Sequence, residues 1–234
     1  GAYTLFSTGG PQQAYRNLFA RDNQDMTETI LARDFERGLE VHNLGYLMTS
    51  PTAGSWGLNK DLVNSYLMTD GSRFTDKPGF ATTGYFEEFQ NRDPRLTQTT
   101  AGPNFTVIGA SAPEPVTLNV TTTGYRVIKA LPTRDQWSSA HFDVVIFRYA
   151  EVLLILAEAK AELGTLQQSD LDRTVNLLRA RVSMPVLNMA AANTNPDAYQ
   201  GALYPNLKND NPNRGVLLEI RRERRIEMFN EGIR

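Results

Sequence analysis

The residues that could carry out chemistry in this sequence are few, and no spacing joins them into a site. There is no cysteine and only two histidines, His42 and His141, so the usual ligand sets of a zinc site are missing. No Gly-x-Ser-x-Gly stretch supports a serine nucleophile. We therefore predict no catalytic residue, no metal and no cofactor. A structural Ca²⁺ among the loop carboxylates stays open, but no calcium-binding motif supports it.

Acidic side chains are so numerous in the first part of the chain that they single out no catalytic pair. Glycoside hydrolysis needs two carboxyl groups that face each other across a cleft. Glycine-rich phosphate-binding loops are also missing, which leaves nucleotide binding without a motif. A hydrolase is therefore an alternative that no feature of the sequence recommends. The nominal carboxylates are Asp61, Asp70, Asp76, Glu87, Glu88 and Asp93.

Aromatic side chains are frequent among the glycine- and proline-rich loops of residues 49–132. Such rings can form platforms for the apolar faces of sugars, while neighbouring polar side chains bind the hydroxyl groups. Trp56 is the strongest candidate, because only glycine and serine flank it and leave its ring uncovered. The alternative is that most of these rings, Phe86 and Phe89 included, form the core of a lobe with few aliphatic residues.

The densest charge cluster lies at residues 219–227, where four arginines are interleaved with three glutamates. Glu219 and Arg222, like Arg224 and Glu227, are three positions apart and neutralise one another on a helix. The net charge of −2 also gives no basic field, so nucleic acid is not an expected partner. An acidic stripe on the helix upstream can face these arginines, and the rigid guanidinium fork suits such fixed pairs. We predict a structural ion-pair network of Arg148, Glu151, Glu158, Glu223, Arg224, Arg225 and Glu227.

Two parts of the chain differ in texture and must position these residues. Residues 1–147 are rich in glycine and proline, which favours loops and short elements, and we expect this loop-rich lobe to face the ligand. Of the 234 residues, 41% are hydrophobic and 21% are charged, so the chain can bury a core and is not globally disordered. The short elements predicted in this lobe are helices at 11–20 and 58–68 and strands at 28–35 and 124–130.

Residues 148–234 have helical periodicity. One helix runs from Arg148 to Gly164, a second lies between Ser169 and Pro185, and both form an antiparallel hairpin of tetratricopeptide type; a Glu/Arg-rich third helix follows. The expected fold class is mainly α, with tetratricopeptide-like helical hairpins, a loop-rich lobe and a few short strands. No apolar run is long enough to span a membrane. The predicted apolar stripes are Tyr149, Val152, Leu153, Leu156 and Leu163 on the first helix, beside a small-residue face of Ala150, Ala157 and Ala161, and Leu171, Val175, Leu178 and Val182 on the second.

Four stretches of the chain resemble, in order, signature sequences of the SusD/RagB family. They are LVNSYLMTDG at 62–71, NRDPRL at 91–96, RYAEVLLILAEA at 148–159 and ERRIEMFNEGIR at 223–234. Each stretch alone is weak, whereas four in the family's order make a specific resemblance. The sequence departs from the family pattern at its end, where family sequences continue into an aromatic segment that contains arginine and tryptophan.

The resemblance implies a non-catalytic binding protein for nutrients. Family members are surface-exposed outer-membrane lipoproteins of Bacteroidetes that bind glycans or peptides and deliver them to a SusC-like TonB-dependent transporter, as part of polysaccharide utilisation. They are longer than this chain and carry a signal peptide, a lipidated cysteine and further helical hairpins. This sequence therefore resembles their C-terminal portion.

The resemblance carries over no ligand-contacting residue, because its signature stretches are scaffold and the ligand loops vary among members. Arg148, Glu151 and Arg224 lie in those stretches and are expected to be structural. We predict that the ligand is bound by Trp56, Phe74, Phe80 and Tyr85, which lie on loops that could form one shallow platform. Two alternatives stay open: a peptide-binding member of the same family, and a helical scaffold that binds only protein.

Overall fold

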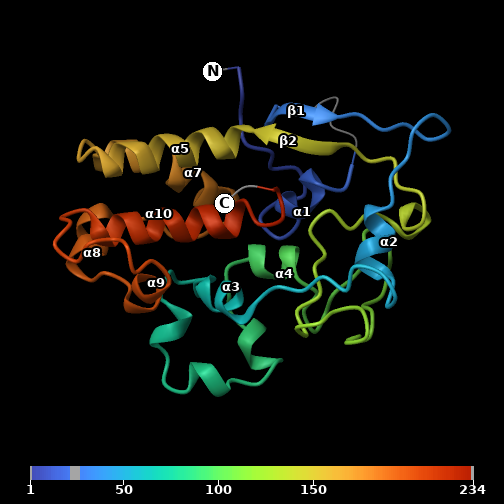
Figure 1. Cartoon of the computed structure of the whole chain (residues 1–234), viewed down its shortest axis with the longest axis horizontal. Coiled ribbons are helices and arrows are strands. Elements are labelled where there is room, and N and C mark those ends of the chain that lie inside the picture. The colour runs from blue at the N-terminus through green and yellow to red at the C-terminus, as the bar shows by residue number, and fades with distance from the viewer. Residues whose placement is uncertain (1, 22–26, 233–234) are drawn as a thin grey trace.

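The computed structural model describes residues 2–21 and 27–232, and in this part of the chain helices dominate (Figure 1). Two long helices, α5 (Tyr149–Glu162) and α10 (Arg214–Glu227), pack along each other at the centre. Both were predicted from the sequence. None of the described helices is long and apolar enough to cross a bilayer.

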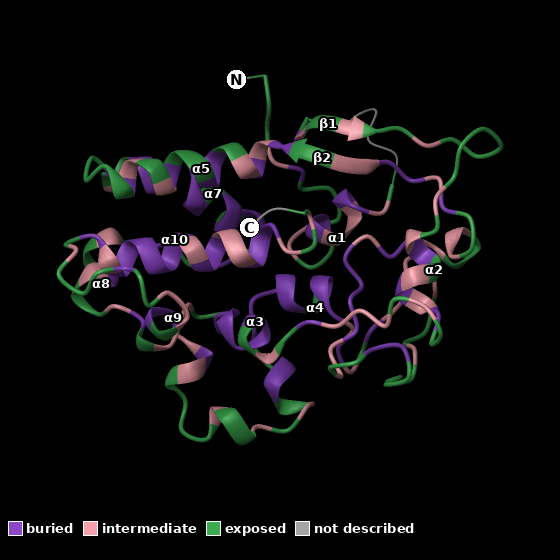
Figure 2. Cartoon of the chain, viewed as in Figure 1, coloured by how far each residue is buried: buried purple, intermediate pink, exposed green. Residues whose placement is uncertain are grey.

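The side of α5 that faces the core differs from the predicted one. The small side chains Ala150 and Ala157 are fully buried with Leu153 and Leu154, whereas most of the predicted stripe lies on the outer side of the helix, which Figure 2 shows as exposed. The stripe was wrong because α5 is apolar on most of its circumference, so periodicity could not choose a face. Small residues allow the closest approach of a second helix. The exposed members are Val152, Leu156 and Leu163.

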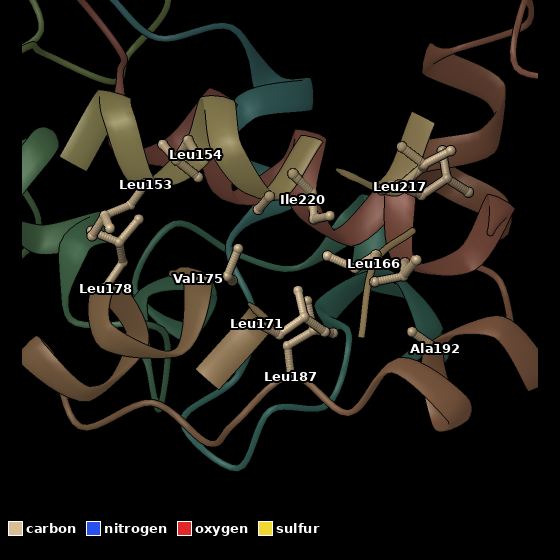
Figure 3. Close-up of a cluster of buried hydrophobic side chains, with 14 of the residues drawn as sticks. Leu153, Leu154, Leu166, Leu171, Val175, Leu178, Leu187, Ala192, Leu217 and Ile220 are labelled. Atoms are coloured by element: carbon tan, nitrogen blue, oxygen red, sulfur yellow. The ribbon is translucent and has the colours of Figure 1, made fainter. Parts of the chain in front are cut away.

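The second helix of the predicted hairpin is divided into α6 (Gln168–Asp172) and α7 (Val175–Arg181). Thr174 breaks it, and its hydroxyl donates to the carbonyl oxygen of Asp170 at 2.5 Å. The predicted apolar residues of this segment, from Leu171 to Val182, are all buried. Figure 3 shows Leu171, Val175 and Leu178 in one hydrophobic cluster with side chains of α5 and α10, whereas Val182 packs in a small cluster with Leu67 and Met184. The hairpin packing is therefore as predicted, although the helix is interrupted.

Gly215, at the start of α10, allows an unusually close helix contact. A Cβ atom at this position would lie 1.9 Å from the carbonyl oxygen of Ala192 in α8 (Met189–Thr194). Only glycine therefore lets the backbones of α8 and α10 meet as they do.

One strand prediction is confirmed and the other is wrong. β1 (Thr29–Arg33) lies within the predicted 28–35 segment and pairs antiparallel with β2 (Val144–Arg148). Residues 124–130 form no strand, because they make only isolated bridges, Arg126 to Gly57 and Val127 to Thr100. Each neighbouring segment thus pairs with a single residue, and no ladder forms.

In the described part of the loop-rich lobe, the helices are short and lie around a second hydrophobic cluster. Leu62, Tyr66, Leu96 and Ile128 belong to this cluster, and so does Ile226 of α10, so the first and last parts of the chain share a core. The predicted 11–20 and 58–68 helices are present in shorter form. The elements not yet given are α1 (Ala14–Leu18), α2 (Leu44–Thr49), α3 (Lys60–Ser65), α4 (Arg95–Thr99) and α9 (Ala198–Leu203), with 3-10 turns η1 (Phe74–Asp76), η2 (Phe80–Thr82), η3 (Glu87–Phe89) and η4 (Arg134–Gln136).

The burial of α5 can be tested with two neighbouring residues. Leu154→Ala is expected to lower the free energy of unfolding by about 2–5 kcal/mol, because it leaves a cavity in the core. The next residue, Ile155, is 50% exposed. Ile155→Ala should therefore change the free energy of unfolding by less than about 0.5 kcal/mol. Urea unfolding followed by circular dichroism measures both. Equal losses would contradict the orientation of α5.

Candidate functional site

A buried carboxylate, Glu227, lies where four elements of the fold meet. Its two oxygens accept from Arg181 of α7 at 2.6 and 2.7 Å, from Arg148 of β2 at 2.8 Å and from Arg95 of α4 at 3.2 Å. All four side chains are almost fully buried. Burial alone would raise the pKa of Glu227, but the three guanidinium groups hold it well below its usual value.

Further ion pairs extend from Glu227 along the inner side of α10. Arg148 also pairs with Glu28 and with Glu231, both at 2.7 Å. Arg95 pairs with Asp93 at 2.6 Å and with Glu223 at 2.9 Å. Because positive and negative groups alternate, each buried charge has a partner that offsets its loss of hydration. We call this set the buried network; its members are Glu28, Asp93, Arg95, Arg148, Arg179, Arg181, Asp197, Glu219, Arg222, Glu223, Glu227 and Glu231.

The structure brings together only some of the residues predicted to form ion pairs. Arg148, Glu223 and Glu227 belong to the buried network, and Glu158 pairs with Arg221 at 3.2 Å on a partly exposed surface. Within the described ranges no ion pair involves the other three predicted residues. The expected pairing of Arg224 with Glu227 is not formed, because Glu227 points into the interior and is used by other arginines. The three without a pair are Glu151, Arg224 and Arg225.

Sequence reasoning missed several members of the buried network, among them Asp93, Arg95, Glu28, Arg181 and Glu231. Asp93 and Arg95 lie in the 91–96 stretch that resembles the SusD/RagB family, so a signal for them was available. Glu28 and Arg181 stand in segments with no such signal, and their contacts with Arg148 and Glu227 bridge distant parts of the chain.

The four predicted ligand-binding aromatics do not form one platform. Phe74 is buried, and the guanidinium carbon of Arg92 lies 3.8 Å from its ring centre, so this face cannot stack on a ligand. Phe80 contacts Phe74 edge-on. Trp56 lines a separate cavity of about 310 Å³, and no aromatic contact among the described residues joins it or Tyr85 to the phenylalanine pair.

Tyr85 lines an open hollow of about 390 Å³ on the loop-rich lobe, which we call the tyrosine hollow. Its hydroxyl donates to the carbonyl oxygen of Ala101 at 2.7 Å, which holds the ring in place. Lys60 enters the hollow from the first turn of α3, a helix whose start is capped by Asn59. The lining of the hollow includes Lys60, Tyr85, Glu88, Val116, Leu118 and Tyr125.

Three polar side chains form a closed hydrogen-bonded triad in the tyrosine hollow. The Tyr125 hydroxyl donates to Glu88 at 2.6 Å, and the Lys60 ammonium donates to the Tyr125 oxygen at 2.7 Å and to Glu88. Burial and the bond to Glu88 raise the pKa of Tyr125. Burial alone would lower the pKa of Lys60, but its two hydrogen bonds raise it. Lys60 therefore stays charged and Tyr125 neutral near pH 7, and the triad offers fixed hydrogen-bonding groups.

Apolar surface lies beside this triad. The rings of Tyr85 and Tyr125 are 6.4 Å apart and inclined by 34°, and the exposed ring of Phe86 meets Tyr85 edge-on at 5.8 Å. Val116 and Leu118 line the same hollow and are exposed. The hollow thus combines flat apolar faces with charged and hydroxyl groups, a combination that suits an amphipathic ligand.

Residues 41–234 match the model of the SusD family. The chain belongs to this family. The matched range includes the tyrosine hollow and every member of the buried network except Glu28. The buried network of this SusD-family chain thus joins residues from several separated stretches of the matched range. No curated protein matches the chain.

Solved structures share the fold of this SusD-family chain. A SusD-like carbohydrate binding protein from Bacteroides fragilis superposes with a TM-score of 0.72 at 24% identity over 100% of this chain and 44% of its own. Another SusD-like protein from Bacteroides fragilis gives 0.63 at 21%, over 98% of this chain and 46% of its own. A SusD superfamily protein from Parabacteroides distasonis gives 0.56 at 18%, over 99% and 41%. The chain spans less than half the length of these structures.

The buried network should be essential for stability. Glu227→Gln is expected to lower the free energy of unfolding by about 3–5 kcal/mol, because it leaves buried guanidinium groups without their shared counter-charge. The matched control is Glu158→Gln. Because Glu158 and its partner Arg221 are partly exposed, loss of this ion pair should lower the free energy of unfolding by no more than about 1 kcal/mol. Urea unfolding measures both. A small effect at Glu227 would show that the network does not hold the fold.

The network also predicts acid-induced unfolding. The pKa values of Glu219, Glu223, Glu227 and Glu231 lie below their usual range, because nearby arginines outweigh burial. As pH falls, these glutamates bind protons near pH 4.3 in the unfolded chain, but only at lower pH in the folded chain. The stabilisation from their ion pairs is therefore complete above about pH 5 and is lost as pH falls further. The melting temperature should be level from pH 6 to 8 and drop steeply below about pH 4.5. A melting temperature that is constant down to pH 3 would contradict this.

Proposed function

We propose that this chain is part of a non-catalytic protein that binds an oligosaccharide in the tyrosine hollow for nutrient uptake. The observation that carries the proposal is the placement of two tyrosine rings and an exposed apolar rim beside the Lys60–Glu88–Tyr125 triad. A sugar ring has the same division, with apolar C–H faces and hydroxyl groups at its edge. The rings would stack on the faces, and the triad would bind the hydroxyls.

The chemistry of the hollow favours binding over cleavage. Glu88 is the carboxylate that lines the hollow, and it is nearly buried and already bonded to Lys60 and Tyr125. Glycoside hydrolysis uses two carboxyl groups on opposite sides of the scissile bond. We therefore propose a binding role that needs neither a cofactor nor a metal ion.

Membership of the SusD family supports the cellular setting of this proposal. One solved relative is described as a SusD-like carbohydrate binding protein, and this chain covers 44% of it. We propose that the whole protein is lipid-anchored and exposed at the outer membrane, and that it delivers its ligand to a SusC-like TonB-dependent transporter. Two alternatives to a sugar ligand are a peptide ligand and a contact with the transporter that involves no ligand.

The binding site can be tested by titrating plant, host and microbial oligosaccharides by calorimetry. Tyr85→Ala should weaken binding of a sugar ligand about tenfold, or about 1.4 kcal/mol, because a stacking face is lost. Tyr46→Ala is the matched control: this tyrosine is also partly exposed but lies on α2, and its loss should leave affinity unchanged. Melting temperatures of both variants confirm that the fold is kept.

Three results would count against this function. If no oligosaccharide binds, the sugar proposal fails. If short peptides bind in place of sugars, the peptide alternative is right. If sugars bind and Tyr85→Ala has no more effect than Tyr46→Ala, the site lies outside the tyrosine hollow.

A further inference from the structure

A second and larger cavity, of about 730 Å³, lies along α10 on the side away from the buried network. Three arginines of successive turns, Arg221, Arg224 and Arg225, line it. We call this cavity the arginine groove. Nothing in the function proposed above uses it.

The three guanidinium groups of the groove differ in how their charge is balanced. Arg221 is neutralised by Glu158 at 3.2 Å and Glu162 at 2.7 Å. Arg224 and Arg225 have no ion pair in the described part of the chain, and the Arg224 side chain has no hydrogen bond there either. Elsewhere on α10, Arg222 pairs with Glu219, whereas Arg214 forms no ion pair among the described residues and donates to the carbonyl oxygen of Leu207. Arg224 and Arg225 are thus two adjacent cations that line the groove without an anion.

Arg225 is held ready for a ligand by neutral groups. One terminal nitrogen donates to the Ser65 hydroxyl at 3.2 Å and the other to the Asn59 side-chain oxygen at 3.3 Å. A guanidinium group has five N–H donors, so these two bonds fix its orientation and leave both its charge and further donors free. Carboxylate and sulfate groups match this planar fork with two parallel hydrogen bonds.

The rest of the groove offers apolar and amide surface beside the positive charge. Leu62, Met228 and Phe229 supply apolar surface, and the side chains of Asn59 and Asn230 supply amide donors and acceptors. Apolar surface with amides suits a sugar ring and its hydroxyls. Consecutive residues at the start of α3 line the two sites, the N-cap Asn59 the groove and Lys60 the tyrosine hollow. The two sites therefore adjoin at the start of this helix.

We propose that the arginine groove binds an acidic sugar, one with a carboxylate or sulfate group, through Arg224 and Arg225. The proposal rests on the function proposed above and narrows its ligand class to acidic oligosaccharides. The acidic unit lies in the groove, and neutral units extend over the start of α3 toward the tyrosine hollow.

The test is calorimetric titration of the chain with three probes: a galacturonic acid tetramer, the same tetramer with its carboxyl groups methyl-esterified, and a sulfated galactose tetramer. We expect an acidic tetramer to bind at least tenfold more tightly than the ester, and its affinity to fall as salt rises, because two partly exposed cations contribute. Tighter binding of the carboxylate or of the sulfate form identifies which acidic group is preferred.

Substitutions separate the groove from a general charge effect. Arg224→Gln should weaken the acidic tetramer about tenfold and leave the ester unchanged, while Arg224→Lys, which keeps the charge but not the fork, should give a smaller loss. Arg37→Gln removes the same charge from an exposed loop residue elsewhere and should have no effect. Melting temperatures show that each variant is folded.

The two proposals fail in different ways. Equal affinity for the acid and the ester, or no change in Arg224→Gln, overturns the acidic-sugar inference. If a neutral oligosaccharide still binds and Tyr85→Ala weakens it, the proposed function stands alone. If a polyglutamate peptide binds the groove more tightly than every sugar, the ligand is a peptide and the inference is wrong. If no sugar binds at all, both proposals fall.

Discussion

The need to pair buried charge is the constraint on which the rest of this structure depends. Glu227 accepts hydrogen bonds from Arg95, Arg148 and Arg181, and these residues belong to α4, the end of β2 and α7. One carboxylate on α10 therefore fixes three other elements at once, because a guanidinium group left without its partner in the interior would be costly. α5 starts directly after Arg148, so the central helix pair is placed by the same contacts. The loops of the first lobe then lie on a frame that does not depend on their own regularity.

Most of the helical frame could be predicted from the sequence, and the failures have local causes. The bounds of α5 followed from periodicity and α10 was expected as a Glu/Arg-rich helix, but the buried side of α5 could not be predicted, since both of its sides are apolar. Residues 124–130 alternate like a strand, yet no neighbouring segment runs beside them for long enough to pair. Three of the stretches that resemble the family supply Arg95, Arg148 and Glu227, which meet in the interior. The stretches that carry the resemblance thus supply residues of one ion-pair arrangement in this chain.

The candidate sites were less predictable, because they depend on contacts between distant segments. Tyr85 could be placed on a loop, but Phe74 is covered by Arg92, which no spacing rule indicates. The triad of Lys60, Glu88 and Tyr125 joins three segments that share no motif. For Arg224 the sequence rule gave the opposite result: a glutamate three positions away promised neutralisation, but it points into the interior. Helical spacing identifies possible neighbours, whereas burial decides which of them a charged group uses.

The buried network also bears on the order in which the chain can fold. Glu28 and Glu231 bind the same side chain, Arg148, so this centre closes only after segments from both ends of the described chain have met. Contacts between residues far apart in sequence form slowly, because loop closure comes before any gain from the contact. The α5 to α7 hairpin is local and can form early. During synthesis on a ribosome, Arg95, Arg148 and Arg181 emerge before Glu227 does, so this part of the interior stays open to water until α10 arrives and completes it.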